Sequence, residues 1–206
     1  MSPINVNTED CLAKHAGTIS ISKEFPIDNN IEIIRDKWGI PHIKANSSHD
    51  VFFAQGYCLG QDRLWQLELF RHIALGRASE LLGEGLIRRD QQNRKLGFSR
   101  YAEIDWEAQT DLSKMILQAY ADGINAAVSS NPLPYEFHLI GNSDNPHEML
   151  PWNPTDSLAI LKMVSANAQW ASKLQYGKIA NTLGGQAVEA LIPDIPFDTS
   201  LITPSG

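Results

Sequence analysis

Alternating apolar and polar residues predict short strands at the start of the chain. Isoleucines alternate with polar residues at 18–22, and similar runs occupy 31–35 and 40–45. This period of two is typical of strands, and the turn at 36–39 contains Gly39, which can adopt a positive φ. We therefore expect a β-hairpin from the second and third runs. Its apolar face would carry Ile31, Ile33 and Ile40 or Ile43.

Apolar positions at intervals of three and four predict helices over most of the remaining chain. In the first helical stretch, 51–82, Gly56 and Gly60 each cost about 1 kcal/mol relative to alanine. This cost indicates either a junction of two helices, the second over 61–82, or close packing against a neighbour. A further helix is expected from a cap at Thr110 to just before Asn131, because Pro132 cannot donate the next helical bond, and another over 155–183.

Proline and charge define the connecting segments. The charged stretch at 83–107 is interpreted as a solvated helix face, and four prolines before Trp152 make 132–154 rich in loops. We therefore expect one segment over 1–206, with a strand-containing start (17–45), a helical body (48–183) and an extended tail (184–206). The fold class is α/β in the broad sense (α+β), and rich in helix.

Composition excludes several classes of function. The 206 residues are 43% apolar and carry 17 Lys and Arg against 24 Asp and Glu, a formal net charge of −7. Without a basic cluster, we expect no nucleic-acid partner and no membrane partner. The first 30 residues contain no apolar run typical of a leader. The chain as written thus predicts a cytoplasmic protein, or a periplasmic or secreted one if a leader has been removed.

Chemical motifs are scarce. The sequence has no phosphate-binding glycine loop, zinc-peptidase motif or α/β-hydrolase nucleophile motif. Cys11 and Cys58 are too isolated for a disulfide framework or a zinc site, and the six histidines are scattered and interpreted as structural. Two pairs at i,i+3 spacing are expected to decorate helix surfaces. They are Glu68 with Arg71 and Arg77 with Glu80.

A succession of motifs nevertheless resembles one family. The run RDKWGIPHI at 35–43, QGY at 55–57 and QDRLWQLE at 61–68 are similar to the start of the penicillin acylases, which are N-terminal-nucleophile amidohydrolases. The likeness covers roughly residues 17–200. It continues at Arg71, 76–83, Asp90, Arg94, 120–125, 133–137 and 151–157.

The resemblance implies the α-chain part of an αββα fold. In this family a precursor is cleaved into α and β chains, and a Ser or Cys at the β-chain N-terminus is the nucleophile. Its own α-amino group, with a pKa of about 8, serves as the base. We therefore expect a β-chain partner, a small-molecule amide substrate, no required cofactor, and no activity from this chain alone. The alternative is a truncated, non-catalytic α-like module that binds a partner.

The resemblance also places candidate site residues on the helix after Trp152. Penicillin G acylases have a Met and a Phe of the acyl pocket at the positions of Ser165 and Gln169, and an Arg at that of Ala168. Neither wall residue is retained, so phenylacetyl specificity is not supported and an aliphatic acyl group or another amide fits as well. Alternatively, Ser165 and Gln169 are helix surface covered by the β chain. The calcium carboxylate of the family falls at Gln175, whose amide contributes no charge.

The strongest motifs receive a structural interpretation. Arg35 with Asp36 and Asp62 with Arg63 are expected to lock the hairpin to the helices through buried, charge-assisted hydrogen bonds. Trp152 is expected to help fix the start of the helix that follows.

Overall fold

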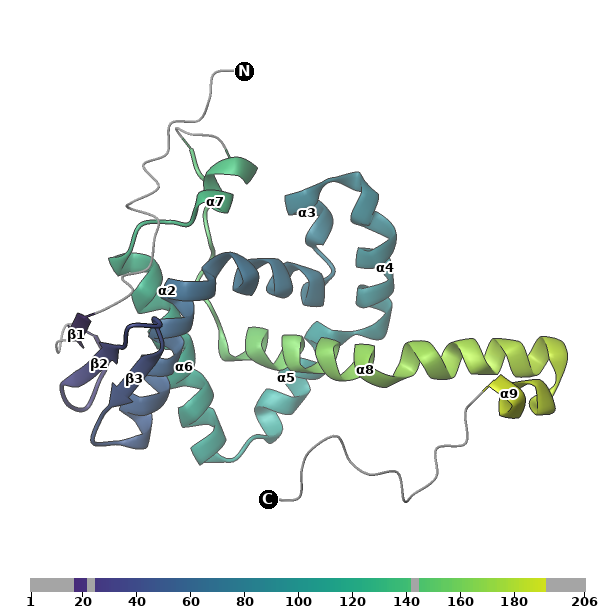
Figure 1. The fold of residues 1–206 in the computed structure, drawn as a ribbon, viewed down its shortest axis with the longest axis horizontal. Helices are drawn as coiled ribbons and strands as arrows, with labels where there is room; N and C mark the ends of the chain where they lie inside the picture. The colour runs from purple at the N-terminus through teal and green to yellow at the C-terminus, as the bar shows by residue number, and fades with distance from the viewer. Residues whose placement is uncertain (1–16, 22–24, 142–144, 192–206) are drawn as a thin grey trace. The chain divides into compact units, whose positions relative to one another are not determined.

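The computed structural model describes residues 17–21, 25–141 and 145–191, without the side chains of 17–20 and 167–172. The chain divides into two compact units, residues 1–163 and 164–206. Figure 1 shows the order of the elements along the chain.

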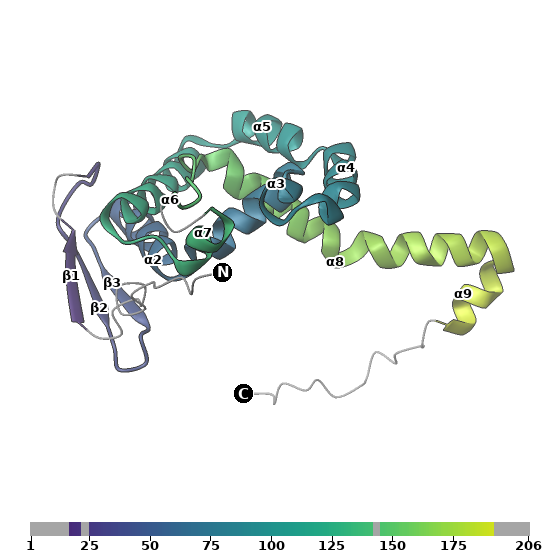
Figure 2. The same cartoon turned by 90° about the horizontal axis from the view of Figure 1, so that it is seen from above.

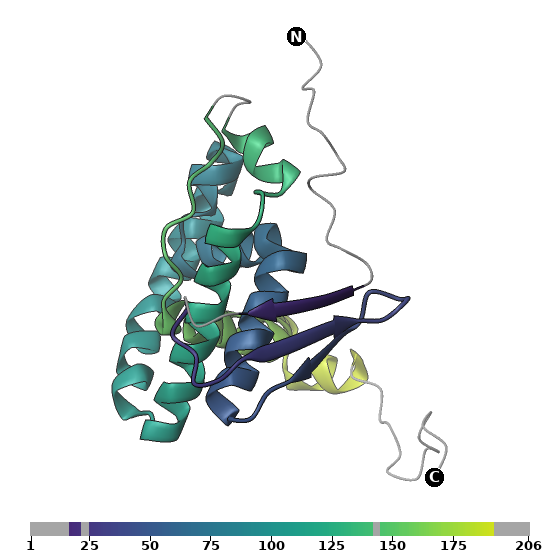
Figure 3. The ribbon, with the colours of Figure 1, turned by 90° about the vertical axis from the view of Figure 1, so that its left-hand side faces the viewer.

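The first unit begins with a three-stranded antiparallel sheet in the order β1-β2-β3. Its strands are β1 (Gly17–Ile21), β2 (Ile31–Arg35) and β3 (Pro41–Lys44), and Figure 3 shows them side by side. The predicted hairpin is confirmed, and Gly39 in its turn has φ 78°. Ile31 and Ile33 are buried, whereas Ile40 is 54% exposed. The apolar face therefore uses Ile43, which packs on the core, rather than Ile40.

Two long helices, α2 (Ser48–Leu75) and α6 (Asp111–Ser130), pack side by side (Figures 2 and 3). A Cβ atom at Gly56 would lie 2.1 Å from the Tyr120 carbonyl oxygen, and one at Gly123 would lie 1.9 Å from that of Phe53. These helices can approach so closely only because both positions are glycine. Of the two alternatives for Gly56 and Gly60, close packing against a neighbouring helix is confirmed.

Polar side chains cap the N-termini of both helices. The Ser47 hydroxyl accepts the Asp50 N–H at 3.1 Å, and the Thr110 hydroxyl accepts the Ser113 N–H at 3.3 Å. Each satisfies a backbone donor that the first turn of a helix leaves free. The predicted ends of α6, at the Thr110 cap and before Asn131, are confirmed.

The predicted helical run over 61–82 is wrong in one respect, because it is two helices. Gly76 adopts the left-handed conformation (φ 65°) and ends α2, and α3 (Ala78–Leu82) begins after Arg77. Within α2, Arg63 also departs from helical dihedrals (φ −139°, ψ 25°), which kinks the helix.

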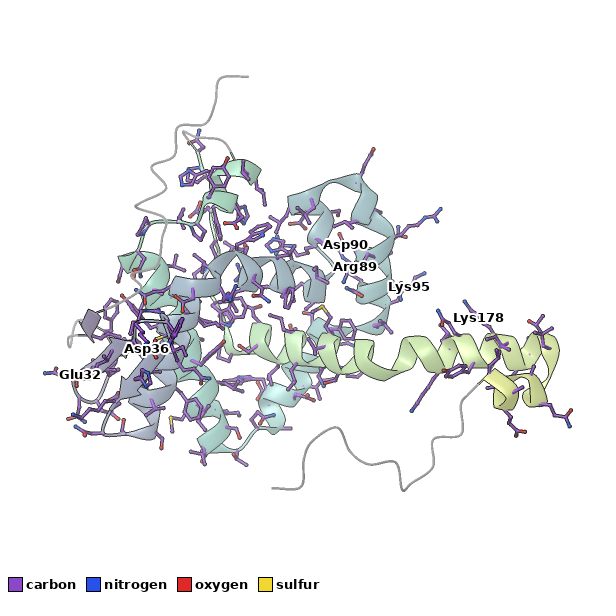
Figure 4. The ribbon with its side chains drawn as sticks, viewed as in Figure 1. Glu32, Asp36, Arg89, Asp90, Lys95 and Lys178 are labelled. Carbon is purple, nitrogen blue, oxygen red and sulfur yellow. The ribbon has the colours of Figure 1, made fainter. Side chains whose placement is uncertain are left out.

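The charged stretch forms a turn of 3₁₀ helix, η1 (Glu84–Leu86), and two helices, α4 (Ile87–Leu96) and α5 (Phe98–Ala108). Its interpretation as a solvated face is incomplete, because Asp90 and Asn93 are buried. Figure 4 labels Asp90 on α4, close to α3. Its carboxylate accepts the N–H groups of Ala78 and Ser79 at 2.9 and 2.8 Å. An acidic side chain from α4 thus caps α3.

Within the expected loop region lies a short helix, α7 (Tyr135–Ile140), which buries Phe137 completely. The final predicted helix is present as α8 (Pro154–Leu183).

The extended tail predicted for 184–206 is wrong over α9 (Gly185–Leu191). After Gly184 (φ 88°) the sequence offers helix-forming residues, and the first proline comes only at Pro193. The tail beyond residue 191 lies outside the described residues. None of the helices in the described ranges is both long and apolar enough to span a membrane.

Candidate functional site

The predicted substrate-binding residues all lie on α8. Ser165 is exposed in the second unit, and the side chains of Ala168 and Gln169 lie outside the described residues. Positions 165, 168 and 169 are related by three and four residues, so helix geometry places them on one face. Their role in binding substrate stays a prediction.

Gln175 does not fit a calcium site on what its surroundings offer. Its side chain is exposed, and an amide oxygen supplies no charge. Within the described ranges, two groups of acidic and histidine side chains lie close enough together to hold a metal ion, and neither group includes Gln175.

The first unit carries an open apolar groove of about 440 Å³. Side chains from α2, α6 and the start of α8 line it, together with Trp152 just before α8. The lining comprises Phe52, Gln55, Leu59, Arg63, Gln66, Leu67, Phe70, Ile116, Leu117, Tyr120, Trp152, Ser157 and Ile160. Burial raises the pKa of the Tyr120 phenol, so this side chain stays neutral at physiological pH. With Arg63 as its one cation, the lining is suited to bury an apolar partner surface.

The predicted lock between the hairpin and the helices is confirmed for Arg35 and Asp62 but not for Arg63, which is exposed and lines the groove. Arg35 Nη2 lies 2.9 Å from Asp62 Oδ1 and also donates to Gln61 Oε1 at 3.1 Å. This charged cluster joins β2 to α2. Asp36 instead closes the hairpin turn by accepting the N–H groups of Trp38 and Ile40 at 2.8 and 3.0 Å.

Cys58 is a buried free thiol on α2. Burial, opposed by the positive charge of Arg35, raises the pKa of this thiol to about 11. A thiol of such high pKa is almost wholly protonated at neutral pH, so it is a poor nucleophile. Cys58 therefore has a structural role, as a packed side chain of the hydrophobic core.

A buried ion-pair network lies where Glu68 and Arg71 were expected to decorate a helix surface. That expectation is wrong, because Glu68 is 1% and Arg71 5% exposed. Arg71 pairs with Glu68 and, at 3.5 Å, with Asp156 on α8, and it donates to the Leu150 carbonyl oxygen at 2.9 Å. It also lies over the Trp152 ring. By contrast, the Arg77–Glu80 pair is half exposed, as predicted.

The start of α8 is fixed by this network and by Asn125. Trp152 donates its N–H to Asn125 Oδ1 at 2.7 Å and accepts from Asn125 Nδ2 at 3.0 Å. Asp156 accepts the Asn153 N–H at 2.9 Å, and burial, only partly offset by this bond and Arg71, raises the pKa of its carboxyl. The prediction that Trp152 fixes this helix start is confirmed.

Two histidines meet at Glu68, which the sequence analysis missed. His147 Nε2 lies 2.9 Å from Glu68 Oε1, and His72 Nδ1 lies 3.0 Å from the Glu68 carbonyl oxygen. Burial lowers the pKa of His72, so its imidazole is neutral at neutral pH. The Glu68-to-His72 spacing of four was a signal in the sequence, but only the tertiary fold brings in His147.

Comparison with known proteins decides the family. A model of the family described as penicillin amidase matches residues 30–200. The chain belongs to this family. Its fold agrees with that of a penicillin G acylase from Alcaligenes faecalis, an N-terminal-nucleophile hydrolase, with a TM-score of 0.61 and 25% identity. That match covers 85% of this chain and 98% of the matched chain.

Curated relatives of this penicillin amidase family member are acylases. The chain is 42% identical over 133 residues (64% of its length) to penicillin acylase 2 proenzyme of Pseudomonas sp. SE83. It is 34% identical over 145 residues (68%) to penicillin G acylase of Escherichia coli. An acyl-homoserine lactone acylase, QuiP of Pseudomonas fluorescens Pf0-1, is 27% identical over 194 residues (92%). The chain spans only 16, 16 and 23% of these proteins, respectively.

Proposed function

We propose that this chain is the α-chain part of an amidohydrolase that cleaves a linear amide by transferring its acyl group to a Ser or Cys at the N-terminus of a separate β chain. One observation carries the proposal. The chain covers 98% of a chain of the A. faecalis penicillin G acylase but only about a sixth of the E. coli enzyme's full sequence. A unit of this size thus corresponds to one chain of an enzyme whose remaining residues lie elsewhere.

In the proposed reaction the β-chain nucleophile attacks the amide carbonyl and gives its proton to the α-amino group. That amine then protonates the leaving amine, and water hydrolyses the acyl-enzyme. The present chain contributes no group to these proton transfers. Its α8 helix would wall the acyl pocket at Ser165, Ala168 and Gln169. The bond cleaved would be the amide that attaches the acyl side chain of a β-lactam, or the amide of a related N-acyl compound.

The apolar groove lined by α2, α6 and the start of α8 supports the proposal that a β chain binds to this chain. Its lining is largely apolar and open, and an acylase of this family has several hundred further residues that could cover it, since the chain spans 16% of the E. coli enzyme. A polypeptide surface with complementary apolar side chains would bury the groove.

The test expresses this chain with a β chain of the family, either from one precursor or as two chains. Amide hydrolysis should require both chains, and the isolated chain should be inactive against a chromogenic amide panel. Turnover by the purified chain alone would refute the proposal that the nucleophile lies on the β chain. A stable complex that never turns over any amide would favour the non-catalytic module.

The groove is tested by Phe70→Glu, which places a charge among its apolar lining side chains. The matched control is Leu82→Glu, because Leu82 is 51% exposed and lies outside the groove. The first substitution should prevent co-purification with the β chain and the second should not. Equal complex yields from both variants would show that the β chain binds elsewhere.

A further inference from the structure

Two imidazoles and a carboxylate converge in the interior of the first unit. Glu68 and His72 lie one turn apart on α2, and His147 comes from the segment before α8. One ligand atom of each lies within 4.8 Å of the others. The side chains of Glu68 and His72 are buried, and that of His147 is 21% exposed, so the cluster is reachable from solvent on one side.

The separations of Glu68 Oε1 from the two imidazole nitrogens are compatible with a tetrahedral metal site. Glu68 Oε1 lies 2.9 Å from His147 Nε2 and 3.5 Å from His72 Nδ1. In a tetrahedral zinc site with bonds of about 2.0 Å, neighbouring ligand atoms are roughly 3.3 Å apart. The observed separations lie on either side of this value. The two imidazole nitrogens lie within 4.8 Å of each other, so side-chain adjustment would bring all three atoms around one ion.

The surroundings hold the ligands in place. The backbone N–H of His147 donates to the Phe137 carbonyl oxygen at 2.8 Å, and the His147 and Phe137 rings pack with centroids 5.6 Å apart. Arg71 binds the other carboxylate oxygen of Glu68, Oε2, which leaves Oε1 to face the histidines. The positive charge of Arg71 is in turn shared with Asp156. Such second partners orient metal ligands in proteins.

We propose that Glu68, His72 and His147 bind a divalent transition-metal ion such as Zn²⁺. The set of two imidazoles and one carboxylate suits zinc and its neighbours rather than calcium, which takes oxygen ligands. Binding replaces the His147 contact with Glu68 and the His72 bond to the Glu68 carbonyl oxygen. Each neutral imidazole keeps its proton on the nitrogen that does not bind the metal. A water molecule completes the coordination at the exposed edge of His147.

The experiment titrates the full 206-residue chain, freed of metal by chelation, with Co²⁺. Visible absorption reports nitrogen and oxygen ligation, and Zn²⁺ competition gives the affinity. We expect one saturable site that Zn²⁺ empties of Co²⁺. His147→Phe should weaken binding at least about tenfold, because losing even a second-shell partner has that effect. The phenyl ring keeps the packing on Phe137 but has no lone pair to donate.

Two matched variants exclude general histidine binding. His42→Gln removes an exposed imidazole, and His49→Gln disrupts the other convergent group, formed with Asp28 and Asp50. Both should bind Co²⁺ as the wild type does. Circular dichroism monitors the fold of every variant.

A second readout needs no variant. Zn²⁺ should protect His147, mapped by mass spectrometry, from acylation by diethyl pyrocarbonate. Absence of saturable Co²⁺ uptake, undiminished uptake by folded His147→Phe, or unprotected His147 would each overturn the proposal.

Discussion

The guanidinium of Arg35 on β2 and the carboxylate of Asp62 on α2 form a two-point contact, Nη1 to Oδ2 and Nη2 to Oδ1, with both distances 2.9 Å. The Arg35 side chain is 3% exposed and that of Asp62 is 29% exposed. Paired hydrogen bonds of this kind fix orientation as well as distance. The contact therefore holds the sheet in place on the helix that also lines the groove and carries Glu68 and His72.

Arg35→Met should destabilise the fold by about 2–3 kcal/mol. Breaking a buried pair costs roughly 3–5 kcal/mol, and the partial exposure of Asp62 lets its carboxylate regain some hydration. Arg77→Met is the control, because its partner Glu80 is well solvated and such pairs contribute at most about 1 kcal/mol. Urea unfolding at pH 7 measures both free energies. Equal losses would contradict the structural role given to Arg35.

Gly123→Ala should destabilise the chain by about 1–3 kcal/mol, the usual cost of overpacking, or by more. The added methyl would lie 1.9 Å from the Phe53 carbonyl oxygen, so α2 and α6 must separate. Gly177→Ala, in the exposed part of α8 where a Cβ meets nothing within 4 Å, should cause no loss. Thermal unfolding followed by circular dichroism compares them. A neutral Gly123→Ala would show that the helices are not so closely packed.

Asp90 should make stability depend on acid pH. Burial opposes its ionisation, but the hydrogen bonds from Ser79 and Ala78 outweigh burial and lower the pKa of this carboxyl. A lowered pKa in the folded state contributes stability above the ordinary value of 3.8, and this contribution is lost as the pH falls through the lowered value.

Asp90→Ala should therefore cost about 1–2 kcal/mol at pH 7, the range for losing a capping side chain, and less at pH 3. Urea midpoints across this pH range measure the difference between the two proteins. A difference that is constant with pH would mean that the charge of Asp90 does not cap α3.

Gln169→Phe tests the proposed acyl pocket in the assembled enzyme. The wild type should prefer aliphatic over phenylacetyl amides, because the aromatic wall is absent. The variant should recover roughly fivefold in the kcat/KM ratio for phenylacetyl, since an aromatic pair contributes about 1 kcal/mol. Gln175→Phe, on an exposed position of the same helix, should leave the ratio unchanged. Phenylacetyl as the best wild-type substrate would place the pocket elsewhere.

The sequence correctly predicted the elements whose ends are set by nearby residues, such as a capping side chain, a proline or a turn glycine. Helix α6 begins at the Thr110 cap and ends before Asn131 and Pro132, and the hairpin turns at Gly39. The break after α2 was missed because Gly76 and Arg77 lie within an unbroken helical pattern, and what makes the break favourable is Asp90, brought to α3 by the fold.

The same limit applies to the buried polar cluster. The spacing of Glu68 and Arg71 is identical to that of an ordinary surface pair, and nothing local shows that the segment containing His147 covers it. Burial depends on how the elements pack together. The sequence could therefore identify the Glu68–Arg71 pair but could not show that it is buried. The substrate-binding prediction at Ser165, Ala168 and Gln169 came from family resemblance, because local patterning carries no signal for a pocket that a second chain would complete.

The central claim, that this chain frames a reaction performed by a nucleophile on another chain, is tested most directly by trapping the covalent intermediate. The assembled enzyme is mixed with an amide substrate, quenched in acid and analysed by mass spectrometry of each chain. The account predicts an acyl adduct on the N-terminal Ser or Cys of the β chain and none on residues 1–206. An acyl adduct on a side chain of this chain, formed at the rate of turnover, would contradict it.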